Sequence, residues 1–141
     1  MSLRILISLI LALIVASVCG YALQTTRSVR DGVYTEDQKK RGTALFMDNC
    51  AACHNQDLSG GEIAPALFGG NFMSDWDGLT VGDLFDRIRV SMPPDNSDKI
   101  NAQQRSDIIS VILNANGFPT GQKELESRVE FLKQIKIEPP K

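Results

Sequence analysis

The sequence predicts an all-α domain of three to five helices. Three segments carry apolar side chains three and four positions apart, the spacing of one face of an α-helix: residues 36–49, 81–90 and 102–115. Each follows a residue that caps helices, and proline or glycine ends the second and the third. The glycine-rich stretch 58–76 has no period, so it is expected to be a loop.

The N-terminus has the form of a secretory signal. Met1–Arg4 carries one positive charge, and residues 5–18 form an unbroken apolar run, as in the n-region and h-region of such signals. Gly20-Tyr21-Ala22 fits a small-x-small cleavage site, so residues 1–22 are expected to leave as a signal peptide. The alternative is an uncleaved membrane anchor, because the apolar stretch extended to Leu23 approaches the roughly 20 residues that span a bilayer.

Export would place the remaining chain in the periplasm or elsewhere outside the cytoplasm. A lipid on Cys19 is a further alternative, although a bulky valine precedes it. We expect an extended lead-in over 23–34, one domain over 35–120 and a C-terminal extension over 121–141 that packs on this domain. The 15 basic and 17 acidic residues give a net charge of −2, and no dense basic patch indicates nucleic-acid binding.

The first helix is predicted to begin at a capping box. Thr35 and Gln38 have the S/T-x-x-E/Q spacing, in which the hydroxyl and the amide each satisfy a free backbone N–H group. Gly42 lies in the middle of this helix, where glycine costs about 1 kcal/mol relative to alanine. Close approach of another helix would explain the glycine, and we expect contact with the last helix near Ile109 and Ile112.

The first helix runs into Cys50-Ala51-Ala52-Cys53-His54. C-x-x-C-H is the sequence to which c-type haem is attached. In that chemistry both thiols form thioethers with the haem vinyl groups, and the histidine becomes the proximal ligand of the iron. The motif therefore predicts one covalent haem c on Cys50 and Cys53, with His54 as an axial ligand.

Three other interpretations of the cysteines fit the rest of the chain less well. A thioredoxin-like redox pair would need a βαβ surrounding, whereas a helix precedes this motif and a glycine-rich loop follows it. A structural zinc site needs four nitrogen or sulfur ligands, and His54 is the single histidine of the chain. A disulfide between Cys50 and Cys53 would close a small strained loop and give His54 no role.

The sixth ligand of the iron is predicted to be Met92. Pro93 biases Met92 towards extended backbone, and the second proline stiffens the loop that would present the thioether. His/Met ligation raises the reduction potential and suits electron transfer. Met73 has no comparable rigid setting, so a packing role is favoured for it.

The C-terminal extension is predicted to contain a short helix followed by extended chain. Ser127 and Glu130 are placed to cap this helix, and Ile135 and Ile137 alternate after it. The helical spacing is carried by three apolar residues: Leu125, Val129 and Leu132.

The chain resembles the class I monohaem cytochromes c over nearly all of residues 35–119. The resemblance is carried by small, aromatic and ligand residues in the family's order: Gly42, Phe46, Cys50, Cys53, His54, the run Ala64-Pro65-Ala66-Leu67, Trp76 and Met92-Pro93.

This resemblance implies a class I cytochrome c fold, in which helices wrap one covalently bound haem and the first and last helices cross at a small residue. It implies that Leu67 lines the haem pocket. It also implies that the Pro65 carbonyl accepts the ring N–H of the proximal histidine, although Pro65 could be an ordinary loop proline. Trp76 is similar to the family's propionate-facing aromatic residue, or it packs in the core.

Three phrases are similar to small cytochromes that accompany quinoprotein dehydrogenases: 57–61, 80–85 and 115–119. We therefore expect an extracytoplasmic single-electron carrier between a dehydrogenase or quinol-oxidising complex and a terminal acceptor such as an oxidase. It would contact a membrane only if the N-terminal segment is retained. The alternatives are a cytochrome subunit of a quinoprotein dehydrogenase complex and a haem enzyme or sensor, against which a bound Met92 argues.

Overall fold

A computed structural model of the chain describes residues 26–94 and 97–140. In these residues the α-helices are α2 (Glu36–Asn49), α3 (Ala51–His54), α4 (Gly69–Trp76), α5 (Val81–Ser91), α6 (Ala102–Ala115) and α7 (Val129–Leu132). The 3₁₀ turns are η1 (Val29–Asp31) and η2 (Ser97–Lys99), and the strands are β1 (Arg27–Ser28) and β2 (Ile135–Lys136).

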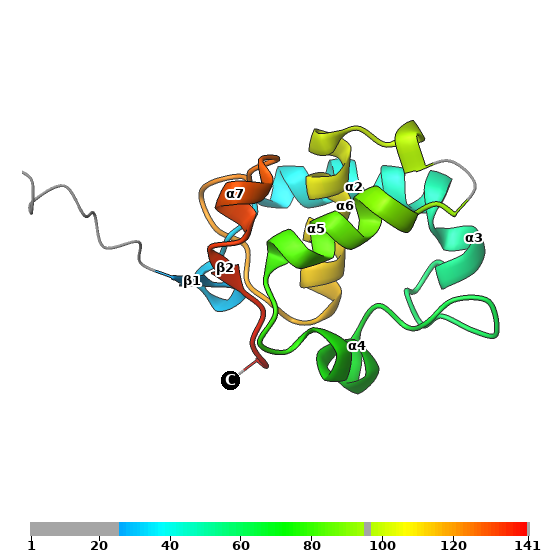
Figure 1. Cartoon of the computed structure of the whole chain (residues 1–141), viewed down its shortest axis with the longest axis horizontal. Coiled ribbons are helices and arrows are strands. Elements are labelled where there is room, and N and C mark those ends of the chain that lie inside the picture. The colour runs from blue at the N-terminus through cyan, green and yellow to red at the C-terminus, as the bar shows by residue number, and fades with distance from the viewer. Residues whose placement is uncertain (1–25, 95–96, 141) are drawn as a thin grey trace, which may run out of the picture.

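The all-α class is confirmed (Figure 1). The expected three to five helices become six in the described part of the chain, because the single turn α3 and the helix α4 add to the four helices that the sequence predicts. The predicted signal peptide, residues 1–22, lies outside the described residues. In the described ranges no helix is both long and apolar enough to cross a bilayer.

The three long helices begin as their caps predict. The Thr35 hydroxyl accepts a hydrogen bond from the Gln38 backbone N–H at 3.1 Å, and reciprocal capping boxes open α5 and α6. The box at α2 is incomplete, because the Gln38 side chain is fully buried and bonds both backbone groups of Leu125 instead. The cap residue therefore also attaches the C-terminal extension to α2.

Helices α2 and α6 cross at Gly42, as expected for a small residue. The nearest atoms on α6 belong to Asp107 and Val111, not to the expected Ile109 and Ile112. Positions 107 and 111 are four apart and lie on one helix face. Ile112 belongs to a different face of α6, which lines an internal cavity.

The stretch 58–76 is not all loop, because α4 occupies its last eight residues. The N-cap residue of α4, Phe68, provides no side-chain hydrogen bond. The Gly69 N–H instead donates to the Asn116 side-chain oxygen at 3.1 Å, a partner 47 residues away in the chain. No local sequence signal could have revealed this cap.

The two ends of the described chain lie side by side (Figure 1). The lead-in, expected to be extended, forms β1 and then a 3₁₀ turn closed by a Ser28–Asp31 capping box. β1 pairs in parallel with β2 of the C-terminal extension. The extension has the expected order of short helix and extended chain, but α7 starts after Arg128 without a side-chain cap, so the predicted caps are wrong.

One hydrophobic core spans the helices and the extension. Its buried members include Phe46 of α2, Phe85 of α5 and Ile109 of α6. The extension adds four buried apolar side chains: Leu125, Leu132, Ile135 and Ile137. Figure 1 shows β1 and β2 at one end of the molecule and α3 at the other.

Candidate haem site

A cavity of about 480 Å³ is lined by residues of α2, α3, α4, α5 and α6 together with the loops that follow α3 and α5. Its lining includes all seven predicted site residues: Cys50, Cys53, His54, Pro65, Leu67, Trp76 and Met92.

Cys50 and Cys53 are brought to one side by the single turn α3. The Cys53 and His54 N–H groups both donate to the Cys50 carbonyl, at 3.1 and 2.9 Å, and residues three apart in such a turn share a face. The two thiols are not joined in a disulfide. Burial, and secondarily the neighbouring Cys53, raise the pKa of the Cys50 thiol to about 11. Redox-active cysteines have a lowered pKa, so this setting does not fit a thioredoxin-like pair.

His54 is buried and has a fixed ring. Its Nδ1 atom lies 2.9 Å from the Pro65 carbonyl oxygen, which can only accept, so Nδ1 carries the proton in the neutral ring. The Nε2 atom then keeps its lone pair for a metal. A contact of this kind orients a ligating histidine and increases its basicity.

Gly60 supports this contact, although it is not among the predicted site residues. Its N–H donates to the His54 carbonyl at 2.9 Å, and its φ is +66°, a conformation that favours glycine. A Cβ at this position would overlap the backbone of Pro65 and Ala66. The glycine pattern 60–61 was visible in the sequence, but its backbone angle and its neighbours were not.

Met92 lies at the end of α5 and lines the cavity. Its backbone is extended, with φ −133° and ψ 131°, as the following proline predicts. Met73 lies on α4, packs partly buried against the core, and does not line the cavity. In the described part of the chain, Met92 is thus the methionine that shares this cavity with His54.

The remaining wall is mainly apolar. Trp76 stacks on Phe72, with ring centroids 6.1 Å apart. Apolar side chains of α5 and α6 complete the wall: Leu84, Ile88, Ile108 and Ile112. The helical spacing of these four residues places them on the apolar faces of their helices. It does not show whether those faces contact another helix or a cavity. Two charged lining residues, Asp75 and Arg87, are not among the predicted site residues.

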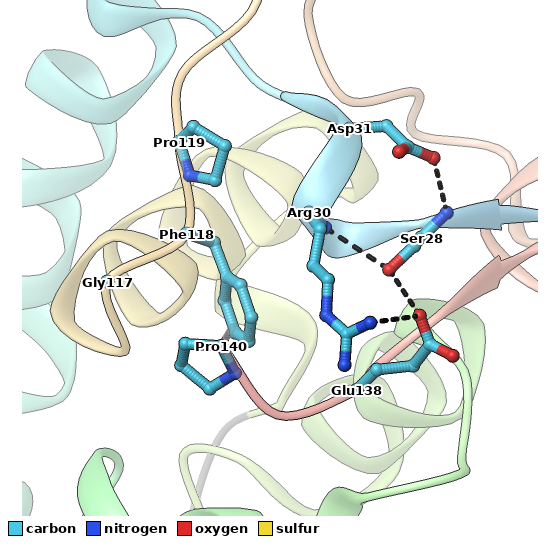
Figure 2. A pocket seen from close by; sticks show the side chains of 8 residues that line it. All are labelled: Ser28, Arg30, Asp31, Gly117, Phe118, Pro119, Glu138 and Pro140. Atoms are coloured by element: carbon cyan, nitrogen blue, oxygen red, sulfur yellow. Dashed lines mark hydrogen bonds and ion pairs between the residues drawn. The ribbon is translucent and has the colours of Figure 1, made fainter.

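A second cavity, of about 390 Å³, lies at the other end of the molecule (Figure 2). Its charges are satisfied within the chain, because Ser28 donates to Glu138 at 2.6 Å and Arg30 lies 3.6 Å from the same carboxylate. None of the predicted site residues lines it.

The larger cavity fits a haem c. Two thiols, an imidazole and a thioether come together in a largely apolar chamber, and these are the groups that attach and ligate a c-type haem. The fold and this donor set define a c-type cytochrome domain. The chain belongs to the family described as cytochrome C oxidase, cbb3-type, subunit III, whose sequence pattern matches residues 37–110.

The chain is also similar to the cytochrome bc1 complex cytochrome c subunit of Corynebacterium diphtheriae. The two are 31% identical over 96 residues, which cover 64% of this chain and 32% of that protein. The chain thus spans about a third of that relative's length. No solved structure matches the chain. The cofactor is covalently bound haem c, Cys50 and Cys53 fit the C-x-x-C-H motif that attaches it, and the matches support electron transfer as its use.

Proposed function

We propose that this chain carries single electrons through one haem c with His54 and Met92 as axial ligands. The observation that carries the proposal is that the two side chains line one cavity from separate elements, α3 and the end of α5. A haem with both axial positions filled has no open site for a substrate, and His/Met ligation suits electron transfer.

The bound haem would supply an iron couple that gains or loses one electron. The chain's own residues hold and tune it. Cys50 and Cys53 fix its position, and the Pro65 carbonyl holds the His54 ring with the unprotonated nitrogen available to the metal. The apolar side chains of α5 and α6 exclude water from the chamber, which is one of the factors that set a haem potential.

A pair of methionine variants tests the ligand assignment. Met92→Ala should abolish the sulfur-to-iron charge-transfer band of the oxidised protein, lower the midpoint potential and let carbon monoxide bind the reduced form. Axial ligands move haem potentials over a range of about 0.8 V, so the change should be large. Met73→Ala is the matched control and should keep the band. The opposite pattern would contradict the assignment.

We propose that the domain works outside the cytoplasm after export through its N-terminal segment, or tethered by it. The donor would be a quinoprotein dehydrogenase or a quinol-oxidising complex, and the acceptor a terminal oxidase. The phrases at 57–61, 80–85 and 115–119 support the first donor. Similarity to a bc1 complex subunit supports the second.

A dedicated subunit of an oxidoreductase complex is the second candidate, because the matched family and the matched relative are both named as subunits of complexes. Purification under native conditions separates the two functions. A diffusing carrier should be released from membranes by washing without detergent. In stopped-flow mixing it should accept electrons from its reduced donor at a rate that falls as the ionic strength rises. A subunit should co-purify with its complex in fixed proportion.

Turnover of a small-molecule substrate at the haem would contradict both proposed functions, the diffusing carrier and the subunit of a complex. The intact protein should not convert peroxide or nitrite faster than free haem does. Rapid conversion by the wild-type protein would place the chain among haem enzymes.

A further inference from the structure

The haem cavity has two charged lining residues, Asp75 of α4 and Arg87 of α5, other than the proposed ligand His54. Across the described residues, neither side chain takes part in a hydrogen bond or an ion pair. Three other arginines have acidic partners: Arg41 bonds Asp107, Arg89 bonds Asp86, and Arg30 of the second cavity lies by Glu138 (Figure 2). Arg87 therefore lies at the cavity with its five donors not bonded to any group of the described residues.

Helix geometry explains why Arg87 lies at the cavity and Arg89 does not. Leu84, Arg87 and Ile88 are spaced three and four apart, so they lie on one face of α5, and all three line the cavity. Arg89 belongs to another face, where its guanidinium bonds Asp86 at 3.0 Å. Arg87 is itself exposed, which places it at the rim, next to buried apolar neighbours.

We infer that Arg87 binds a carboxylate of the haem. Haem carries two propionates, on the pyrrole rings that do not bear the vinyl groups, so the edge captured by Cys50 and Cys53 is not the edge that carries them. The anionic edge needs donors from other elements, and α5 supplies one. A guanidinium matches a carboxylate with two parallel hydrogen bonds. Asp75, the other charged group at the cavity, would repel a carboxylate.

The charge of Arg87 would also affect the midpoint potential of the haem. Reduction adds an electron to the haem, so a nearby fixed cation favours the reduced form and raises the midpoint potential, whereas Asp75 lowers it. Arg87 is thus a positioning residue, which orients the haem edge and offsets its charge. This inference rests on the covalent haem c and does not depend on which residue is the sixth ligand.

The test compares Arg87→Met with Arg89→Met in the holoprotein. Arg87→Met should lower the midpoint potential and shift the carboxylate bands of the haem in the infrared redox difference spectrum. Arg89→Met removes the same charge two residues away, outside the cavity, and should leave the carboxylate bands unchanged and the potential nearly so. Arg87→Lys keeps the charge and should recover most of the potential, with the bands still shifted because lysine cannot form the bidentate pair.

Unchanged carboxylate bands in both Arg87 variants would overturn the inference, as would equal effects in Arg87→Met and Arg89→Met. If Arg87→Met fails to accumulate as holoprotein, Arg87→Lys decides the question through the same bands. Asp75→Asn adds an independent readout and should raise the potential. Retention of the sulfur-to-iron band in the Arg87 variants would show that their shifts do not come from a lost axial ligand.

Discussion

Gly42 of α2 lies so close to the Asp107 carbonyl of α6 that a Cβ at position 42 would overlap this oxygen. The adjacent Arg41 forms two hydrogen bonds with the Asp107 carboxylate, at 3.1 and 3.2 Å. The backbone contact of Gly42 and the ion pair of Arg41 therefore both join α2 to Asp107, at the point where the two helices cross. Because α6 also lines the haem cavity, the missing side chain at 42 sets the position of one cavity wall.

Gly42→Val should push α2 and α6 apart. Overpacking of a tight interior costs about 1–3 kcal/mol, and we expect a loss of this size in the free energy of unfolding of the holoprotein, measured by denaturant titration. Gly70→Ala is the matched control, since nothing lies within 4 Å of a Cβ there and alanine favours a helix by up to about 1 kcal/mol. Equal stability of Gly42→Val and the wild type would contradict the proposed contact.

The sequence predicted those parts of the fold whose signals are local. Helices α2, α5 and α6 each combine an apolar period with a cap within the first turn, so both signals lie in a few neighbouring residues. Helix α4 was missed because Asn116 bonds its first N–H from a distant part of the chain. The parallel pairing of β1 with β2 is equally non-local.

The residues of the site divide in the same way, into those with a local sequence signal and those without one. Motif residues such as His54 and Met92 could be named because their types and spacings carry chemistry. Arg87 and Gly60 could not, since their roles depend on what lies beside them in space. Arginine on an exposed helix face is ordinary in a sequence, and only the fold shows that this one lines a cavity.

Gly60→Ala should weaken the contact between His54 and the Pro65 carbonyl. The new Cβ must displace the Pro65 backbone, and the positive φ adds strain. A proximal histidine that loses this acceptor becomes less basic, which disfavours oxidised iron and should raise the midpoint potential. Redox titration of the holoprotein measures the shift.

The adjacent glycine offers the control for that variant. A Cβ at Gly61 would meet only the Asn55 side-chain nitrogen, at 3.9 Å, so Gly61→Ala should keep the wild-type potential. If Gly60→Ala and Gly61→Ala have the same midpoint potential, the contact between His54 and the Pro65 carbonyl does not depend on Gly60.

The capping box of α5 should make stability depend on pH. Hydrogen bonds from Thr80, whose N–H and hydroxyl donate to the Asp83 carboxylate at 2.9 and 2.7 Å, lower the pKa of Asp83. With the folded pKa below the unfolded value of about 3.9, the stabilisation is present above that value and is lost as the pH falls through the folded pKa.

Asp83→Asn should therefore lower the free energy of unfolding at pH 7, by less than the roughly 0.5–2 kcal/mol expected for Thr80→Ala at the N-cap. The deficit of Asp83→Asn should shrink below about pH 4. Denaturant titrations across pH provide the measurement. Asp48→Asn, at an exposed aspartate near the end of α2, should show no such deficit. A deficit that stays constant with pH would contradict the role of the charge.

Gln38→Ala should release the C-terminal extension from α2. The buried Gln38 amide donates to the Leu125 carbonyl at 3.0 Å and accepts from the Leu125 N–H at 2.7 Å. Truncation leaves two backbone groups without partners, at about 1–3 kcal/mol for each buried group that stays unsatisfied.

Hydrogen exchange around residues 122–128 should accelerate before the rest of the protein changes, because these bonds lie outside the haem cavity. Gln134→Ala, at a half-buried glutamine of the same extension whose side chain bonds only the nearby Glu130 carbonyl, should leave this exchange unchanged. Faster exchange throughout α2 and α6 would instead mean that Gln38 supports the whole core.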